Sequence, residues 1–182
     1  MSQQQPVPLT PILVAPDNAD YRSLLTWPFS DQPFFEGQVR RLLQLEIPQR
    51  ILFGATRIWV YRDPTQNMVG FGTLQVSNEY EQFTGGHFHS YIPLLAVNPV
   101  FQKRGHGRSI VEHLIAEAVL LRMASNLSDH LFLDVYTANK GAIALYEKCG
   151  FAILNPHTPI ADPLENNETF FVMAKKIAAP GT

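Results

Sequence analysis

The sequence lacks the features that mark disulfide-stabilised, secreted and membrane-spanning proteins. Its single cysteine, Cys149, excludes an internal disulfide and a cysteine-based metal cluster, and it suits a reducing compartment. Residues 1–8 are polar and contain proline, so they do not form the basic and apolar regions of a signal peptide. No apolar run approaches the roughly 20 residues that span a bilayer. We therefore expect a cytoplasmic protein with no membrane partner.

An excess of charge of either sign is also missing. The 14 basic and 16 acidic residues give a formal net charge of -2, so we expect no nucleic-acid partner. A hydrophobic content of 46% in 182 residues is enough for the core of one globular domain. Neither repeats nor linkers divide the chain. We expect one domain over residues 9–177, between a disordered tail over 1–8 and a frayed tail over 178–182.

The most informative stretch is a glycine-containing loop that opens onto an amphipathic helix. Residues 102–107 read Gln-Lys-Arg-Gly-His-Gly. The two glycines allow a tight turn and a close approach to a ligand. The unpaired N–H groups of the first helical turn, together with the helix dipole, favour an anion. Lys103, Arg104 and Arg108 add positive charge there, so the pattern predicts a phosphate-binding site.

Two familiar nucleotide loops fit this stretch poorly. A P-loop needs Gly-Lys-Ser/Thr after four spacer residues, and that sequence is missing. A Rossmann turn needs a small residue where Ile110 stands and an acidic residue about twenty positions further on. Asp134 is too far along and lies inside its predicted strand, and the loop after Val97 is too long. Neither alternative accounts for the pattern.

Two ordered motifs carry a more specific resemblance. A Val-Asn-Pro strand end precedes the Gln-x-x-Gly-x-Gly loop, and Asn139 is followed by a Leu-Tyr-x-x-x-Gly-Phe segment that ends at Phe151. This arrangement resembles the GNAT family of N-acetyltransferases, strongly over residues 89–151 and only in architecture elsewhere. The resemblance implies a single-domain α/β fold, with a mixed, splayed sheet of six or seven strands and helices on both faces.

The resemblance also implies a reaction. The chain would transfer an acetyl group from acetyl-CoA, as co-substrate, to a primary amine by direct attack in a ternary complex. The acceptor would be a small-molecule or peptide amine, and the sequence is compatible with a homodimer. Two rival functions are a non-catalytic CoA-binding sensor and a toxin-type acetyltransferase that acts on aminoacyl-tRNA. The near-neutral charge disfavours the second rival.

Apolar periodicity predicts the elements that would carry these motifs. Strands are expected over residues 9–15, 58–61, 69–76, 87–97, 131–135, 151–154 and 169–174, and helices over 18–25, 30–48, 108–125 and 139–150. Pro48 is expected to end the second helix, and the resemblance places residues 27–35 over the acceptor cleft. Gly70 and Gly72 leave room on one face of their strand. Pro93 cannot donate a ladder hydrogen bond, so it predicts a bulge or splay, or else marks a strand start.

The resemblance assigns cofactor contacts to a set of residues on both sides of the glycine loop. Backbone groups of the splayed strand would pair with the pantetheine arm, and an N–H near Leu95 would stabilise the oxyanion. The expected cofactor-binding residues are Leu95, Ala96, Val97, Gln102, Lys103, Arg104, Gly105, His106, Gly107, Arg108, Asn139 and Ala142.

Tyr146 is the candidate acid for the departing thiolate. Asn139, Ala142 and Tyr146 recur at helical spacing, so they lie on one stripe of the last helix. In the family, the matching tyrosine places its hydroxyl at the sulfur. A phenol with a pKa of about 10 is well suited to protonate a thiolate with a pKa of roughly 8.5. The alternative is that Tyr146 is an aromatic core residue.

The candidate base is His89. No acidic residue occurs from Phe83 to Val97, and His89 stands where a related branch of the family often has a glutamate. A neutral imidazole with a pKa of about 6.5 is a competent base. The alternative is a strand histidine with no role, and Glu79 and Glu81 are weaker candidates. Together with a neighbouring histidine, His89 would form half a metal site, but no further ligands are spaced for one, so no metal is expected.

Overall fold

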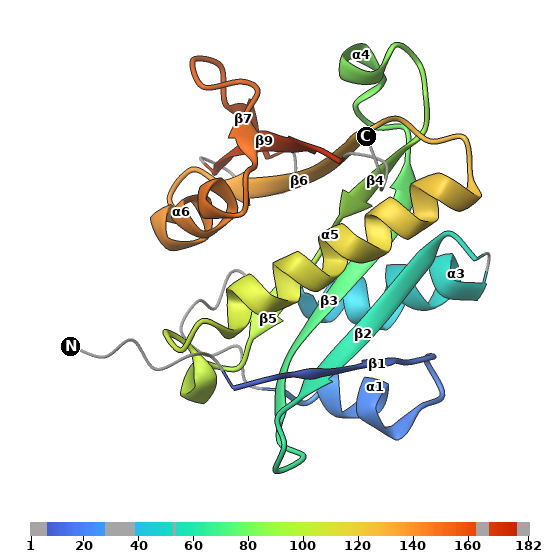
Figure 1. Cartoon of the computed structure of the whole chain (residues 1–182), viewed down its shortest axis with the longest axis vertical. Helices are drawn as coiled ribbons and strands as arrows, with labels where there is room; N and C mark the ends of the chain where they lie inside the picture. The colour runs from blue at the N-terminus through green and yellow to red at the C-terminus, as the bar shows by residue number, and fades with distance from the viewer. Residues whose placement is uncertain (1–6, 28–38, 53, 163–167, 178–182) are drawn as a thin grey trace. The chain divides into compact units, whose positions relative to one another are not determined.

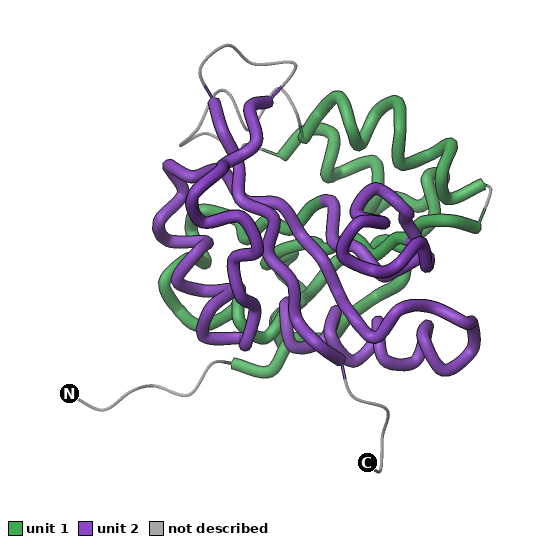
Figure 2. Tube along the Cα trace, turned by 90° about the horizontal axis from the view of Figure 1, so that it is seen from above, with its two compact units in different colours: residues 1–75, 94–110 green, residues 76–93, 111–182 purple. Residues whose placement is uncertain are grey.

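The structure is a computed structural model that describes residues 7–27, 39–52, 54–162 and 168–177. The chain divides into two compact units, each built from two stretches of sequence (Figure 2). Unit 1 holds residues 1–75 and 94–110, and unit 2 holds residues 76–93 and 111–182. The predicted domain limits at residues 9 and 177 stay predictions, because residues 1–6 and 178–182 lie outside the described part.

The helices and strands follow one another in a mixed order (Figure 1). In chain order they are β1 (Thr10–Leu13), α1 (Ala19–Leu24), a π-helical segment (Leu42–Glu46), α3 (Ile47–Leu52), β2 (Thr56–Arg62), β3 (Met68–Ser77), α4 (Glu81–Thr84), β4 (His89–Ile92), β5 (Leu95–Val97), a 3-10 turn (Pro99–Phe101), α5 (His106–Ala124), β6 (His130–Tyr136), α6 (Lys140–Lys148), β7 (Ala152–Ile153), β8 (Ile160–Ala161) and β9 (Thr169–Lys176).

Unit 1 is built on antiparallel strands. β1 pairs with β2, β2 pairs with β3, and β3 also pairs with β5. Pro11 lies in β1, opposite Tyr61, where an edge strand tolerates a residue that has no N–H. The hairpin between β2 and β3 is closed by Asp63, whose side chain accepts a hydrogen bond from the Asn67 N–H at 2.9 Å. Buried apolar side chains from these strands and from residues 14–27 and 39–47 contribute to the core of this unit.

One helix prediction in unit 1 is wrong. The helical chain runs without a break from residue 39 to Leu52, so it continues past Pro48, although Pro48 has no N–H to donate within the helix. The turn before it is π-helical, and the N–H of Ile47 donates to the carbonyl of Leu42. The start of this predicted helix, and most of the segment expected over the acceptor cleft, fall in residues 28–38, outside the described part.

The interruption predicted at Pro93 is confirmed. The single strand expected over residues 87–97 is divided into β4 in unit 2 and β5 in unit 1. β4 runs parallel to β6, whereas β5 runs antiparallel to β3. Leu94 is held in place by Thr73, whose hydroxyl accepts from the Leu94 N–H at 2.9 Å. Because proline supplies no ladder donor, the strand is interrupted where the sequence predicts a defect.

Unit 2 mixes parallel and antiparallel pairing. β4 is parallel to β6, β6 is antiparallel to β9, and the short β7 and β8 both pair with β9. The predicted α/β class with a mixed sheet is therefore confirmed. Nine strands lie in the described part of the chain, instead of six or seven, because the strand predicted over residues 87–97 divides and the two-residue strand β8 is added. Among the described residues, no helix is long and apolar enough to cross a bilayer.

Helix α5 starts at His106 rather than at the predicted Arg108, and its first turns lie close to β3. A Cβ atom on Gly70 would come within 2.6 Å of Ile110 Cδ1 and 2.7 Å of the Ala96 carbonyl oxygen. The space that the sequence assigns to Gly70 is therefore used by the packing of α5 and β5 on β3. This close packing fixes where the glycine loop leads into the helix.

Candidate active site

The glycine loop is shaped by hydrogen bonds back to its own strand. The Asn98 side chain accepts from the Val100 N–H at 3.2 Å, and the Gln102 amide donates to the Val97 carbonyl at 3.0 Å. Lys103 and Gly105 both have positive φ, at 60° and 85°. Such a backbone suits glycine and is strained for lysine. The chain thereby turns sharply from β5 into α5.

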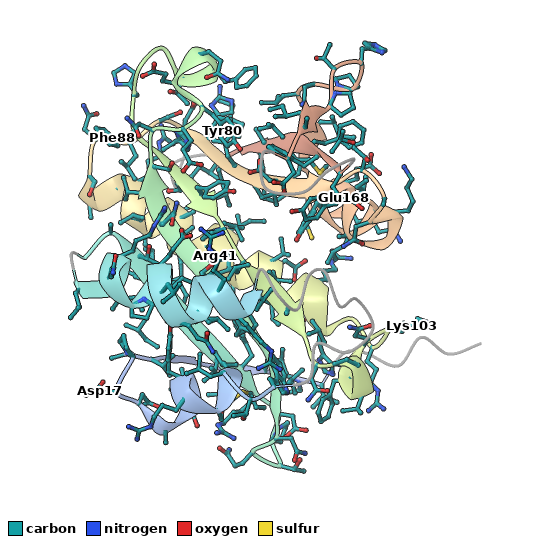
Figure 3. The ribbon with its side chains drawn as sticks, turned by 180° about the vertical axis from the view of Figure 1, so that it is seen from behind. Asp17, Arg41, Tyr80, Phe88, Lys103 and Glu168 are labelled. Carbon is teal, nitrogen blue, oxygen red and sulfur yellow. The ribbon has the colours of Figure 1, made fainter. Side chains whose placement is uncertain are left out.

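The start of α5 is a positively charged helix terminus. Lys103, Arg104 and Arg108 are exposed there, and Figure 3 labels Lys103 on the loop. The Arg104 guanidinium lies 5.8 Å from the centre of the Phe101 ring. Burial and the neighbouring Arg104 charge lower the pKa of His106, so at neutral pH its imidazole is uncharged. The side chains of Lys103, Arg104 and Arg108, together with the helix dipole, supply the positive potential that favours binding of an anion.

The strand before the loop offers backbone groups. Leu95, Ala96 and Val97 form β5 and are half-buried. Within unit 1, β5 pairs with β3 along one edge, and the described part of this unit places no strand on its other edge. An extended ligand with amide groups can pair with such an edge. The expected role of these three residues in cofactor binding stays a prediction.

Asn139 and Tyr146 mark the two ends of α6. Asn139 caps the helix by accepting from the Ala142 N–H at 3.0 Å, which confirms that the helix opens at Asn139 and gives its side chain a structural role. Tyr146 is 8% exposed and contacts the ring of Phe151, 6.0 Å away between centres. Burial, with the nearby Cys149, raises the pKa of Tyr146 to about 12. Its hydroxyl therefore stays protonated at neutral pH and acts as a donor.

The predicted base, His89, is enclosed. Its side chain is 0% exposed, with its ring 4.5 Å from that of Phe132 and 6.0 Å from that of Tyr80. Burial lowers the pKa of His89, opposed by a backbone group of His87. Neither ring nitrogen makes a hydrogen bond of normal geometry in the described part of the protein. The imidazole is neutral, as a base requires, but it has no exposed surface at which to meet an amine.

A half-buried carboxylate in the same unit as His89 was missed as a catalytic candidate. Asp134 lies in β6 between two buried apolar residues and is itself only half-buried. The Tyr80 hydroxyl donates to its Oδ1 at 2.5 Å, and the Tyr91 hydroxyl donates to its Oδ2 at 2.8 Å. Burial raises the pKa of Asp134 to about 6, the two tyrosines oppose this shift, and the charge of Glu79 adds to it. A carboxylate in this state is a candidate general base.

The surroundings of Asp134 are aromatic and apolar. Phe132 and Asp134 share one face of β6, because strand residues two apart point the same way. The cluster on this face consists of Tyr80, Tyr91, Phe132, Val172 and Ala174, with Phe170 packed against it. The sequence signal that could have identified Asp134 is an acidic residue inside the apolar run of residues 131–135. Burying a charged side chain is costly unless it is paired or hydrogen-bonded, so such a residue is a candidate for a functional role. In the sequence, Asp134 was considered only as the acidic residue of a Rossmann turn.

The sequence-predicted site residues fall into two groups (Figure 2). Unit 1 holds the glycine loop, the start of α5 and β5, which are the expected phosphate and pantetheine contacts. Unit 2 holds His89, Asn139, Ala142 and Tyr146, and it also holds Asp134. Unit 1 thus holds most of the residues expected to bind the cofactor, whereas unit 2 holds Asn139, Ala142 and the residues expected to move protons.

Comparisons with known proteins indicate the family and the type of reaction. The family model described as Acetyltransferase (GNAT) family matches residues 19–151. A [Ribosomal protein bS18]-alanine N-acetyltransferase of Salmonella typhimurium is 30% identical over 156 residues, which cover 84% of this chain and 83% of that protein. The enzyme of the same name from Escherichia coli strain K12 is 44% identical over 57 residues, 31% of this chain and 35% of that protein.

Solved structures show the same fold at lower identity. A mutant form of the spermidine/spermine N-acetyltransferase SpeG from Vibrio cholerae aligns with a TM-score of 0.62 and 20% identity, covering 93% of this chain and 95% of that one. A chain of the NatC complex bound to Gag peptide and CoA aligns with a TM-score of 0.63 and 18% identity, covering 93% and 99%. With the family match over residues 19–151, these findings show that the chain belongs to the GNAT acetyltransferase family and is an N-acetyltransferase.

Proposed function

We propose that the chain transfers the acetyl group of acetyl-CoA to the N-terminal α-amino group of a protein or peptide. The observation that carries this proposal is the half-buried Asp134 carboxylate, whose pKa is about 6. An α-ammonium group has a pKa of about 8, whereas lysine-like amines have a pKa of about 10.4. Proton transfer to Asp134 is therefore much less unfavourable from an α-amine. The similarity to an enzyme named for the alanine of ribosomal protein bS18 supports the same acceptor class.

The residues of unit 1 fit the phosphate and amide groups of acetyl-CoA. The first-turn N–H groups of α5 and the charges of Lys103, Arg104 and Arg108 suit phosphate, and the positive φ of Gly105 lets the backbone approach closely. The edge of β5 suits the amides of the pantetheine arm, with an N–H near Leu95 facing the oxyanion. The other residues of the stretch 102–108 would shape the loop around the phosphate. When bound, acetyl-CoA supplies an activated thioester.

The residues of unit 2 are assigned the proton transfers. Asp134 accepts a proton from the acceptor ammonium group, so that the neutral nitrogen forms a bond with the thioester carbonyl carbon. The C–S bond then breaks, and the Tyr146 hydroxyl gives its proton to the departing sulfur. The new amide nitrogen loses its second proton, which restores the Tyr146 hydroxyl, and Asp134 releases its proton to solvent. The role assigned to each of these groups is a proposal, and mutagenesis can test each role separately.

His89 is the rival base. It would act through a water, since its ring has no exposed surface. If His89 is the base, His89→Ala should abolish the acidic limb of the rate profile and lower turnover on the order of a hundredfold. If Asp134 is the base, Asp134→Asn should abolish the acidic limb and lower turnover to a similar extent. In that case His89→Ala should leave the pH of the acidic limb unchanged.

The proposed acceptor class is tested by thiol release from acetyl-CoA with three acceptors. These are a peptide with a free N-terminus, the same peptide with a blocked N-terminus and one internal lysine, and spermidine. We expect turnover with the first at a kcat/KM at least about a hundredfold above the other two, because their amines are more basic. Faster turnover of spermidine or of the blocked peptide would contradict the proposal while leaving the family assignment intact.

A further inference from the structure

We propose that Tyr80 and Tyr91 are positioning residues that hold the Asp134 carboxylate ionised and oriented to take the proton of the acceptor amine. This inference rests on the proposed function, and it assigns a catalytic contribution to two residues that sequence reasoning gave no role. Their hydroxyl groups come from different parts of unit 2, the segment before α4 and strand β4, and meet on one side chain of β6.

The geometry gives each carboxylate oxygen its own phenol. Tyr80 donates to Oδ1 at 2.5 Å, a length typical of a hydroxyl bound to a charged acceptor, and Tyr91 donates to Oδ2 at 2.8 Å, the usual length of a hydroxyl hydrogen bond. Figure 3 labels Tyr80, which is 7% exposed and packs against the rings of Tyr91 and Phe132. Two donors on opposite oxygens fix the plane of the carboxylate and stabilise its ionised form.

The phenols are needed because everything else around Asp134 favours its neutral form. The aromatic cluster removes water from the carboxylate, and the acidic Glu79 repels its charge. His89, which stacks on Tyr80, has a lowered pKa and brings no positive charge at neutral pH. Burial and the neighbouring Asp134 raise the pKa of both tyrosines, so they remain donors throughout the working range. Without them, a buried carboxylate would be protonated at neutral pH and unable to act as a base.

The test compares Tyr80→Phe, Tyr91→Phe and the double variant with the wild type. The readout is kcat/KM against pH with a peptide acceptor. Each lost hydroxyl should move the acidic limb to higher pH by about one unit. At pH 6.5 the double variant should therefore lose kcat/KM on the order of twentyfold, and at pH 9.5 it should recover to within about tenfold of the wild type.

The matched control is Tyr136→Phe. Tyr136 also lies in β6 on the same face as Asp134, but its hydroxyl donates to Asp162 at 2.6 Å. Its loss removes a phenol of the same kind without touching Asp134, so the acidic limb should stay in place. An equal shift in this control, or no shift in the single and double variants of Tyr80 and Tyr91, would overturn the proposal.

A second measurement does not depend on turnover. The Asp134 carboxyl carbon is followed by NMR during a pH titration of protein labelled with ¹³C-aspartate, and its signal is identified by its loss in Asp134→Asn. The single variants serve if the double variant does not fold. The titration midpoint should rise in Tyr80→Phe and Tyr91→Phe, and an unchanged midpoint would overturn the proposal. A midpoint that rises while the kinetic limb stays fixed would overturn Asp134 as the base, and with it the catalytic role of the phenols. Absence of turnover with every acceptor, beside a midpoint that rises, would refute the proposed acceptor class instead.

Discussion

At the scale of single residues, Asp134 combines a functional candidate with a cost in stability. Its pKa is raised by burial from 3.8 in the unfolded chain to about 6 in the fold. A raised carboxyl pKa means that the folded protein binds the proton more tightly than the unfolded chain does. The contribution of the protonated Asp134 carboxyl to the free energy of unfolding is therefore fully present below pH 4, and it is lost as the pH rises through 6. Residues retained at such a cost are often functional.

Asp134→Asn should therefore stabilise the protein at neutral pH. The shift of the Asp134 pKa corresponds to up to about 3 kcal/mol in the free energy of unfolding. Melting temperatures at pH 4, 6 and 8 check this. The variant should melt above the wild type at pH 8, and the difference should vanish at pH 4. A variant that is less stable than the wild type at pH 8 would show that the ionised carboxylate stabilises the fold.

Tyr146→Phe tests the proposed leaving-group acid. Because the pKa of Tyr146 is about 12, its hydroxyl is protonated at any pH where the protein is assayed. Turnover should fall by a factor on the order of a hundred, equally at pH 7 and pH 9, with little change in acetyl-CoA affinity. Tyr21→Phe is a matched control, since this buried phenol donates to the Leu43 carbonyl in unit 1. Wild-type turnover in Tyr146→Phe would show that its hydroxyl has no catalytic role.

At the scale of elements, local chemistry in the sequence predicts where elements begin, end and break. Pro93 interrupts its strand, Asn139 caps α6, and Gly150 ends it with a φ of 87°. The N–H of Phe151 then donates to the Tyr146 carbonyl at 3.0 Å, as in a typical left-handed helix ending. Each of these outcomes depends on neighbours in sequence, which is why it could be predicted. Pro48 was misjudged because the π-helical turn before it leaves no local signal.

The catalytic candidates of unit 2 could not be predicted in the same way. Tyr80 and Asp134 are 54 residues apart, and only the pairing of β4 with β6 and the path of the α4 segment bring them together. His89 was chosen by its position in a strand, and its complete burial depends on rings contributed by Tyr80 and Phe132. Contacts between distant segments decide which titratable group is reachable.

The packing of α5 on β3 gives a prediction at the same scale. Gly70→Ala should destabilise the protein by about 1–3 kcal/mol, because its Cβ would collide with Ile110 Cδ1 and with the rigid Ala96 carbonyl. Gly141→Ala in α6 is the matched control. Its Cβ would meet nothing nearer than Asn139 Oδ1 at 3.9 Å, and alanine favours a helix by about 1 kcal/mol. Urea unfolding measures both, and equal stabilities of the two variants would contradict the described packing.

At the scale of the whole molecule, the cofactor should stabilise the fold. Acetyl-CoA at about a hundred times its dissociation constant should add roughly 2.7 kcal/mol to the free energy of unfolding through mass action. Replacing Gly105 by a bulky residue should remove this gain, because a side chain is strained at a φ of 85° and blocks the backbone approach. Thermal melts with and without acetyl-CoA check both statements. Unchanged melting of the wild type would contradict the assigned cofactor site.

The oligomeric state and cellular location of the protein stay predictions from sequence. The comparisons establish the family and its activity class, and the structure adds a set of titratable side chains in unit 2 as candidates for proton transfer. The acceptor links the two, because the pKa of Asp134 matches an α-amine better than a lysine or polyamine amine.

The most direct test is therefore the position of the acetyl group on a peptide that offers both amines. A peptide with a free N-terminal alanine and an internal lysine is incubated with the enzyme and acetyl-CoA, and the product is sequenced by tandem mass spectrometry. The account predicts one acetyl group, on the α-amine, and a loss of this product on the order of a hundredfold in Asp134→Asn at neutral pH. Acetylation of the lysine side chain, or an undiminished product with Asp134→Asn, would contradict it.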